Sequence, residues 1–346
     1  MSQAALSFVE LLTRLAEHEP LSRAQAYRAM QIMLSGEATA EQIAAFLLGL
    51  RSRGETAEEL TGLTEAMREV AVQVDAPPRA VDIVGTGGDR SGSFNISTAT
   101  AFVCAGAGAI VAKHGNRSVS SKCGSADVLE VLGVKTELGK QGVEHCLQTA
   151  GIAFIFAPYF HPTLKHVMPV RRALGVRTCF NILGPLCNPA GVKRHLIGAF
   201  SSEVAEIMAQ ILINLGSEHV FCVHAHDGLD ELSLSGPTTV YSATSAAPTL
   251  VSTEVVPADF GLSEAPLSNI IGGNANENAE ILLGVLRGET GPKQDIVLLN
   301  AGFALVAAGK AASATLGIEL ARQSIASGNA LESLERLVAA SNEEVT

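Results

Sequence analysis

The stretch VDIVGTGGDRSGSFNISTATAFVCAGAGAIVAKHG, residues 81–115, decides the fold. Residues 80–89 begin with a short apolar run that is typical of a buried strand and leads into a glycine-rich loop. Residues 97–109 predict a helix, and residues 109–115 predict a second strand. Because strands and helices alternate, the stretch indicates an α/β sheet with helices packed on it.

The chain after this stretch continues the same alternation. Further strands are predicted at 153–158, 194–201, 219–227 and 238–243. Helices are predicted at 202–216, 276–288 and 294–309. No repeat of fixed period interrupts this pattern, so the sequence predicts one large α/β domain that extends from residue 81 to residue 346.

The chain before the stretch predicts helices only. A first helix is expected within 8–19, and three capping boxes mark the starts of three more: Ser22 with Gln25, Thr39 with Gln42, and Thr56 with Glu59. Residues 1–71 therefore form a predicted small helical domain. Residues 72–80 contain two prolines and predict the linker between the two domains.

Composition and charge exclude several classes of protein. The chain has 346 residues, of which 47% are hydrophobic, and this favours two domains with large cores. A net charge of −11 disfavours a nucleic-acid or anionic-membrane surface, although it permits a local basic pocket. We find no signal peptide, no apolar run long enough to span a bilayer and no C-x-x-C pair among the six cysteines. The expected location is the cytoplasm.

The loop GTGGDRSGSFNIST, residues 85–98, resembles a phosphate-binding cradle. Glycines directly after a strand let the backbone approach a ligand, and their N–H groups can form an anion-binding nest. Polar side chains then stand at the start of the next helix: Asn95, Ser97 and Thr98. The spacing matches neither a Rossmann fingerprint nor a Walker A loop. The alternative is an ordinary tight turn followed by a helix cap.

The segment KHGNRSVSSKCGSADVLEVLG, residues 113–133, predicts a second cradle. Lys113 ends a strand, where ligands bind in open α/β sheets, and Arg117 offers a guanidinium fork. A helix is expected from Ser125 to Gly133. Hydroxyls that can donate to phosphate oxygens come from Ser118, Ser120, Ser121 and Ser125. The alternative is a polar surface loop.

The turn HAHDGLDELS, residues 224–233, places Asp227, Asp230 and Glu231 after a strand. Crowded carboxylates repel one another, and a hard cation relieves that repulsion. Mg²⁺ takes one or two carboxylates and completes its coordination with waters and substrate phosphates. The turn therefore predicts a magnesium site, with a solvated acidic turn as the alternative.

Residues 161–190 contain candidate groups for a second ligand. Arg171 and Arg172 are expected to precede a short helix, and Gly184 and Pro185 are expected to form a loop after it. An arginine at a pocket mouth can bind a carboxylate in bidentate fashion. The alternatives are a salt bridge within the protein for the arginines and a capping or surface role for His161 and His166.

These segments together resemble the anthranilate phosphoribosyltransferase family of tryptophan biosynthesis. The resemblance covers nearly the whole chain and rests on GTGGD, NIST, KHGNRSVSSKCGSADVLE, FIFAPYFHP, VRRALGVRTCFNILGPLCNPA and DGLDE. It implies a nucleoside-phosphorylase-like fold, with a small helical domain and a large α/β domain built on a mainly parallel central sheet. It also implies that part of 165–190 packs on the helical domain, and that this domain forms a homodimer interface.

The resemblance also implies the site residues. Those for phosphoribosyl diphosphate are Gly85, Gly88, Asp89, Ser93, Asn95, Ser97, Thr98, Lys113, Asn116, Ser118, Ser121 and Ser125. Those along the path of anthranilate are Gly85, His114, Asn116, His161, Arg171, Gly184 and Pro185, with Arg171 facing the carboxylate. The magnesium contacts are Ser97, Asp230 and Glu231. The resemblance leaves Arg90, Arg117 and Cys123 without a role.

The implied reaction joins anthranilate to 5-phosphoribosyl 1-diphosphate, with Mg²⁺ as the cofactor and diphosphate as the leaving group. This is the second step from chorismate to tryptophan, and it needs no protein nucleophile. Two alternatives stay open: a nucleic-acid-binding relative of the same fold, and a nucleoside or pyrimidine phosphorylase. The first needs a basic groove, which a charge of −11 disfavours, and the second needs no paired carboxylates for Mg²⁺.

Overall fold

The computed structural model describes residues 7–118 and 122–344 of the chain. Its first part is helical, as predicted, with the helices α1 (Phe8–Ala16), α2 (Arg23–Ser35), α3 (Ala40–Arg53) and α4 (Ala57–Glu69). The three expected capping boxes are present, and Ser7 with Glu10 makes a fourth at α1. Residues 72–80 contain no helix or strand, which supports the proposed linker.

The second part contains a sheet of seven strands within the described residues. They follow the spatial order β3-β2-β1-β4-β5-β6-β7. Their bounds are β1 (Val81–Gly85), β2 (Val111–Gly115), β3 (Ile152–Phe156), β4 (Arg194–Gly198), β5 (His219–Ala225), β6 (Thr238–Thr244) and β7 (Ala247–Val255). The first five strands pair in parallel and the last two pair antiparallel, which confirms the mainly parallel sheet.

The strand β7 was not predicted. Most of its side chains are exposed, so the strand lacks the apolar alternation by which a half-buried strand is recognised in a sequence. It pairs with β6 on one side only and forms the edge of the sheet.

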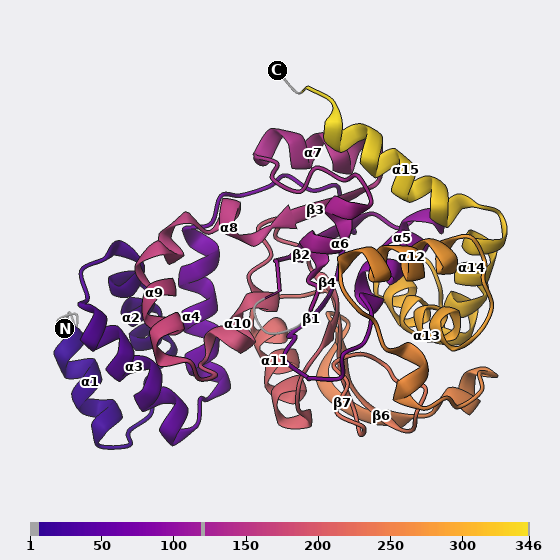
Figure 1. Ribbon diagram of the computed structural model, residues 1–346. Helices are drawn as coiled ribbons and strands as arrows, with labels where there is room; N and C mark the ends of the chain where they lie inside the picture. Colours follow the sequence, from indigo (N-terminus) through magenta and orange to yellow (C-terminus); the bar gives the residue numbers. More distant parts are fainter. Residues whose placement is uncertain (1–6, 119–121, 345–346) are drawn as a thin grey trace.

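Helices cover both faces of the sheet (Figure 1). On one face lie α5 (Ile96–Gly106) and the later helices α12 (Ala275–Leu286), α13 (Pro292–Ala307), α14 (Ala314–Ala326) and α15 (Asn329–Asn342). On the other lie α10 (Phe180–Leu186) and α11 (Ser202–Asn214). The remaining helices are α6 (Ser125–Val131), α7 (Lys140–Thr149), α8 (Ala157–Phe160), α9 (Met168–Leu174) and the short 3₁₀ turns η1 (Pro162–His166), η2 (Pro257–Phe260) and η3 (Leu267–Ile270).

The described residues form two apolar cores. One lies between the sheet and the helices α5 and α12–α15. The other is continuous from α1–α4 through α10 and α11 to the opposite face of β4 and β5, where Ile197 and Val220 point. In the same region η1 contacts α2, α9 contacts α3, and α10 contacts α4. The helical part is therefore packed on α10 and α11, which connect it to the α/β part (Figure 1).

The strand order places a ligand-binding edge at the carboxyl end of β1. From β1 the chain continues through α5 to β2 on one side, whereas β4 pairs with β1 on the other side. Ligands bind at the carboxyl ends of the strands where the order reverses in this way. The glycine-rich loop after β1 and the acidic turn after β5 both lie at this edge.

Candidate active site

The acidic turn packs directly against the glycine-rich loop. The Oδ2 atom of Asp230 accepts a hydrogen bond from the main-chain N–H of Gly87 at 2.7 Å. A Cβ atom at Gly85 would lie 2.5 Å from the same oxygen, and one at Gly198 would lie 1.5 Å from the main-chain oxygen of Asp230. The ends of β1 and β4 therefore need glycine, because only glycine leaves room for the acidic turn.

The two carboxylates of this turn are buried together. Asp230 is 8% exposed and Glu231 is 7% exposed. Burial raises the pKa of both carboxyls, and the charge of Asp89 raises that of Asp230 further. The charge of Asp230 also raises the pKa of Glu231, whereas Lys113 acts in the opposite direction. Two buried carboxylates with raised pKa values lack sufficient positive charge, which a divalent cation would supply.

Asp227 plays a different part from the one expected. Its Oδ2 accepts from the Ser233 hydroxyl at 2.5 Å and from the Ser235 hydroxyl, and its Oδ1 accepts from the N–H of Leu229 at 3.0 Å. Its carboxylate thus holds the shape of the turn. The crowding predicted for three carboxylates therefore falls on Asp230, Glu231 and Asp89.

Oxygen donors around this pair suit a hard cation. Within the described part of the chain, the buried Oδ2 of Asp89 has no hydrogen-bond partner. Among the described residues, no three His, Cys, Asp or Glu side chains are placed to hold a metal by themselves. Mg²⁺ commonly takes only one or two carboxylates, so the donor set fits Mg²⁺ that is completed by water and substrate phosphate.

Lys113 connects the two predicted cradles. It lies in β2, 4% exposed, and its Nζ donates to the main-chain oxygen of Ile83 at 2.5 Å and to the Ser97 hydroxyl at 3.1 Å. Burial lowers its pKa, and the carboxylates of Asp82, Glu231 and Asp230 oppose that shift. A lysine has three N–H donors, so the described contacts leave one for a further acceptor.

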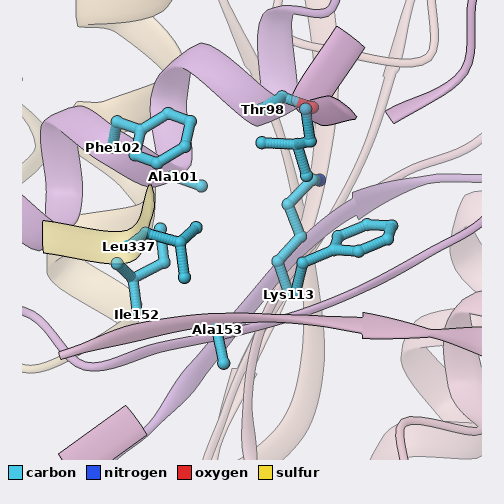
Figure 2. A pocket seen from close by; sticks show the side chains of 9 residues that line it. Thr98, Ala101, Phe102, Lys113, Ile152, Ala153 and Leu337 are labelled. Carbon is cyan, nitrogen blue, oxygen red and sulfur yellow. The ribbon is translucent and has the colours of Figure 1, made fainter. Parts of the chain in front are cut away.

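Figure 2 shows the surroundings of the Lys113 stem. The side chain extends from β2 towards Thr98 in α5, beside a small cavity lined by Phe102, Ile152 and Leu337. The Thr98 hydroxyl is buried and has no hydrogen-bond partner among the described residues. Apolar packing along the stem thus fixes where the ammonium group lies.

The remaining residues of the first loop lie in a chain of polar contacts. Ser93 forms an isolated bridge with Ile271, and its hydroxyl accepts from that of Ser91 at 3.1 Å. Asn95 precedes α5, and its Oδ1 accepts from the side chain of Asn278 at 2.9 Å. Helix α12 thus supports this loop, a contact between segments about 180 residues apart that no local pattern announces.

The second loop is described in part. Asn116 follows β2, and its main-chain oxygen accepts from the Ser125 hydroxyl at 3.2 Å, at the start of α6. Ser118 is described, whereas Ser120 and Ser121 lie outside the described residues. The assignment of Ser121 to the phosphoribosyl diphosphate site therefore stays a prediction.

Two buried histidines face each other beside this edge. The ring centroids of His114 and His161 are 5.3 Å apart. Burial, together with the nearby His161, lowers the pKa of His114 to about 3. Burial also lowers the pKa of His161 to about 4. Both imidazoles are therefore neutral at pH 7.

The arginine expected to bind a carboxylate has no acidic partner. Arg171 forms no salt bridge within the described residues, and its guanidinium lies 4.9 Å from the ring centroid of Phe180. Burial lowers its pKa. The alternative, an internal salt bridge of Arg171, is thus wrong within the described residues. The partly buried guanidinium can pair with an anionic ligand.

Two expectations about 165–190 need correction. Arg171 and Arg172 precede the short helix α10 but themselves lie within another helix, α9, and Gly184 and Pro185 are not in a loop but within α10. Proline is disfavoured in helix interiors because it lacks an N–H donor. Here Pro185 lies in the last turn of a helix that ends at Leu186, so α10 stops directly after the missing donor.

Two groups that support the site were not predicted from the sequence. Arg177 donates to the main-chain oxygen of Gly88, and its guanidinium lies 4.3 Å from the ring centroid of Phe200. Asp82 is fully buried in β1, where it accepts from the N–H of His114 at 3.1 Å and from the side chain of Asn188 at 2.8 Å. An aspartate inside a buried strand was the available signal, since buried charges need partners.

Comparisons with known proteins agree with this architecture. Residues 9–71 match the model "Glycosyl transferase family, helical bundle domain", and residues 77–331 match "Glycosyl transferase family, a/b domain". An anthranilate phosphoribosyltransferase of Salinibacter ruber is 54% identical over 337 residues, which cover 96% of this chain and 98% of the relative. One from Symbiobacterium thermophilum is 50% identical and covers 94% of this chain and 96% of its own.

Solved structures agree as well. The anthranilate phosphoribosyltransferase of Thermus thermophilus superposes with a TM-score of 0.91 at 42% identity, over 96% of this chain and 99% of that one. The enzyme of Saccharomyces cerevisiae, solved in complex with PRPP and Mg, superposes with a TM-score of 0.87 at 31% identity, over 96% and 97% of the two chains. This chain belongs to the anthranilate phosphoribosyltransferase family of glycosyltransferases.

Proposed function

We propose that this chain transfers the phosphoribosyl group of 5-phosphoribosyl 1-diphosphate to the amine of anthranilate, with Mg²⁺ as the cofactor. The products are N-(5-phosphoribosyl)anthranilate and diphosphate, in the second step from chorismate to tryptophan. One observation carries the proposal. Asp230 and Glu231 are buried next to each other at the carboxyl edge of the sheet, and Asp230 contacts the glycine-rich loop.

The sugar diphosphate binds along this edge. The loop residues Gly85, Gly88 and Asp89, with Ser93, Asn95, Ser97 and Thr98, surround the diphosphate. Lys113, Asn116, Ser118, Ser121 and Ser125 bind the phosphoribosyl part from the other side. The support is structural: Lys113 already bridges the two loops through Ile83 and Ser97. Oriented backbone dipoles and a buried ammonium bind phosphate oxygens well because little water competes.

Asp230, Glu231 and Ser97 are the proposed residues that hold Mg²⁺. When bound, Mg²⁺ neutralises charge on the diphosphate oxygens and so makes diphosphate a better leaving group. The raised pKa values of the two carboxyls support this role, because a divalent cation would stabilise their ionised forms.

Anthranilate binds on the side of the helical part. Arg171 pairs with its carboxylate, while Gly85, His114, Asn116, His161, Gly184 and Pro185 line its path. The arylamine reaches the site uncharged. The imidazoles of His114 and His161 are also neutral, so they fit an uncharged amine. These groups hold the amine in line with the sugar C1 atom, which develops oxocarbenium character as the bond to diphosphate breaks.

The first experiment follows the fluorescence of anthranilate after addition of the protein, 5-phosphoribosyl 1-diphosphate and Mg²⁺. We expect the signal to fall only when both the sugar diphosphate and the metal are present, with EDTA and no-sugar samples as controls. An unchanged signal from folded protein would reject the proposal. Phosphorolysis of nucleosides with inorganic phosphate and a gel shift with DNA at physiological salt then test the two alternatives.

Arg171 gives a sharper test of the acceptor site. Because its guanidinium pairs with a carboxylate, Arg171→Ala should raise the KM for anthranilate about tenfold or more and that for the sugar diphosphate much less. Arg172→Ala is the matched control, since Arg172 is the adjacent exposed arginine of the same helix. Equal KM values for anthranilate in the two variants would contradict the assignment.

Assembly and location complete the proposal. We place a homodimer interface on the helical part, where the apolar side chains of Val9 in α1 and Leu48 in α3 are exposed. Sedimentation of the wild type against a Val9→Glu, Leu48→Glu variant tests this interface.

No helix in the described residues is long and apolar enough to cross a membrane. The proposed partners are the two small substrates alone, with neither nucleic acid nor membrane, in the cytoplasm.

A further inference from the structure

The carboxylate of Asp127 joins both ends of a segment of the second loop. Its Oδ2 atom accepts from the main-chain N–H of Ser118 at 3.2 Å and from that of Gly124 at 2.7 Å. Its Oδ1 atom accepts from the guanidinium of Arg117 at 3.3 Å. A single side chain thus bonds to Ser118, which lies after the end of β2, and to Gly124, which directly precedes α6.

The two ends are in direct contact at this point. A Cβ atom on Gly124 would lie 2.3 Å from the nitrogen of Ser118 and 2.6 Å from the carbonyl carbon of Arg117. On the other side of the contact, the N–H of Ala126 donates to the main-chain oxygen of Asn116 at 3.3 Å. The two ends of the segment therefore meet and close its base, and Asp127 provides the charged hydrogen-bond acceptor at this point.

Arg117 fixes this closure to the body of the protein. Its guanidinium forms a bidentate pair with Glu130 at 2.8 and 2.6 Å, and it lies 5.5 Å from the ring centroid of Phe156 in β3. A weaker contact reaches Glu137 at 3.5 Å. The hydrogen bond from Arg117 lowers the pKa of Glu130, whose Oε1 also accepts from Thr136. The arginine thus ties the loop to α6, to the segment after α6 and to β3.

Neither residue points to a ligand of its own, because the carboxylate oxygens of Asp127 and the terminal guanidinium nitrogens of Arg117 are bonded within the protein. The residues that they hold in place are the ones proposed to bind the phosphoribosyl group: Asn116, Ser118 and Ser125. Main-chain and side-chain donors bind a phosphate well only when they are fixed before it arrives. If the two ends were separated, binding of the same ligand would cost the conformational entropy of ordering the loop.

We propose that Asp127 and Arg117 are positioning residues for 5-phosphoribosyl 1-diphosphate. Asp127 closes the base of the second loop, and Arg117 holds the closed base against Glu130 and Phe156. This inference rests on the proposed function, because it concerns one substrate of that reaction. It assigns a task to Arg117, which the family resemblance left without a role. The guanidinium fork that the sequence offered to a phosphate is paired with Glu130 instead.

The main test compares Asp127→Ala with Asp259→Ala. Asp259 accepts from the N–H of Val256 at 2.9 Å at the start of another short helix, so it is a matched capping aspartate outside the site. We expect Asp127→Ala to raise the KM for the sugar diphosphate about tenfold or more, with the KM for anthranilate changed less than about twofold. Asp259→Ala should leave both constants as in the wild type.

A binding measurement separates this inference from the proposed function. Calorimetric titration of 5-phosphoribosyl 1-diphosphate with Mg²⁺ into each variant should show the same loss of affinity without any turnover. If the wild type neither binds nor reacts, the proposed function fails. If the wild type does both and Asp127→Ala keeps its affinity for the sugar diphosphate, the positioning role is wrong.

Conservative variants test the geometry. Lysine cannot reproduce the planar fork of Arg117, so Arg117→Lys should raise the KM for the sugar diphosphate, although less than Arg117→Ala does. Arg336→Ala, which removes an exposed pair with Glu332 on α15, is the matched control. A fall in thermal stability without any change in that KM, in both Arg117 variants, would reduce Arg117 to a structural ion pair and overturn the proposal for it.

Discussion

Two groups of carboxylates in this molecule differ in their burial, in the direction of their pKa shifts and in their ion pairs. Asp230 and Glu231 are buried beside Asp89, and burial and mutual repulsion raise their pKa values. Asp127, Glu130 and Glu137 surround Arg117 near the surface, and hydrogen bonding to Arg117 lowers the pKa of Glu130. The first group has too little positive charge nearby to balance its carboxylates, whereas the second group is paired with Arg117.

This difference indicates two roles. The buried carboxylates form a site for an added cation, whereas the exposed carboxylates are already paired with the cationic side chain of Arg117. A buried pair of carboxylates costs stability until a cation or a proton neutralises it, so such a pair persists where a ligand supplies the charge. An exposed ion-pair cluster costs little, and its gain is geometric, since it fixes which backbone groups lie together. The same residue types thus serve binding in one place and positioning in the other.

Removal of the buried charge should have the largest effect. Asp230→Asn and Glu231→Gln keep the shape of the turn but weaken the hold on Mg²⁺, so kcat/KM should fall about a hundredfold or more. Steady-state rates over a series of Mg²⁺ concentrations check this. Asp259→Asn is the control, because Asp259 accepts from the N–H of Val256 at a short helix outside the site. Near-normal rates in the Asp230 and Glu231 variants would refute their assigned role.

The second prediction displaces the turn without any change of charge. A Cβ atom at Gly198 would overlap the main-chain oxygen of Asp230, so Gly198→Ala should lower the free energy of unfolding by about 1–3 kcal/mol and reduce activity. Gly139→Ala is the control, because no atom lies within 4 Å of a Cβ there. Denaturant unfolding of the two variants measures the difference. Equal stabilities would show that β4 and the turn separate easily.

The third prediction concerns pH and compares the two groups directly. Burial raises the pKa of Asp230 to about 7 and that of Glu231 to about 8, so the folded protein holds these protons more tightly than the unfolded chain. Without Mg²⁺ and substrate, stability should therefore fall as the pH rises from about 5 to about 8. The lowered pKa of Glu130 has the opposite sign, and its contribution is lost only on acidification below its usual pKa.

Thermal unfolding across this pH range, with EDTA present, checks the third prediction. The double variant Asp230→Asn, Glu231→Gln should be more stable than the wild type near pH 8 and should show a flatter profile. A wild-type profile that rises over the same range would contradict the unpaired state of the two carboxylates.

The smallest effect is expected at the edge of the exposed group. Glu137 is 51% exposed and lies 3.5 Å from Arg117, so Glu137→Gln should change the free energy of unfolding by less than about 0.5 kcal/mol. Denaturant titration measures it, beside Glu130→Gln, which breaks the bidentate pair and should cost more. A larger effect at Glu137 would mean that the cluster acts as a network rather than through Glu130 and Asp127.

The sequence by itself determined the local features. Capping boxes marked the starts of α2, α3 and α4, because a cap is formed by residues three positions apart. Apolar runs next to glycine-rich turns marked β1 and β2, because strand burial and turn chemistry are written in neighbouring residues. The carboxylates Asp230 and Glu231 were recognisable as a pair for the same reason.

Only the tertiary structure decided which groups are paired. Asp227, Asp230 and Glu231 look alike in the sequence, yet Asp227 bonds within its turn and the other two are buried against Gly85 and Gly198. The contacts of Arg117 with Phe156 and of Asn95 with Asn278 join residues far apart in the chain. The charge state and role of a side chain depend on its burial and its partners, and these are fixed only when distant segments pack together.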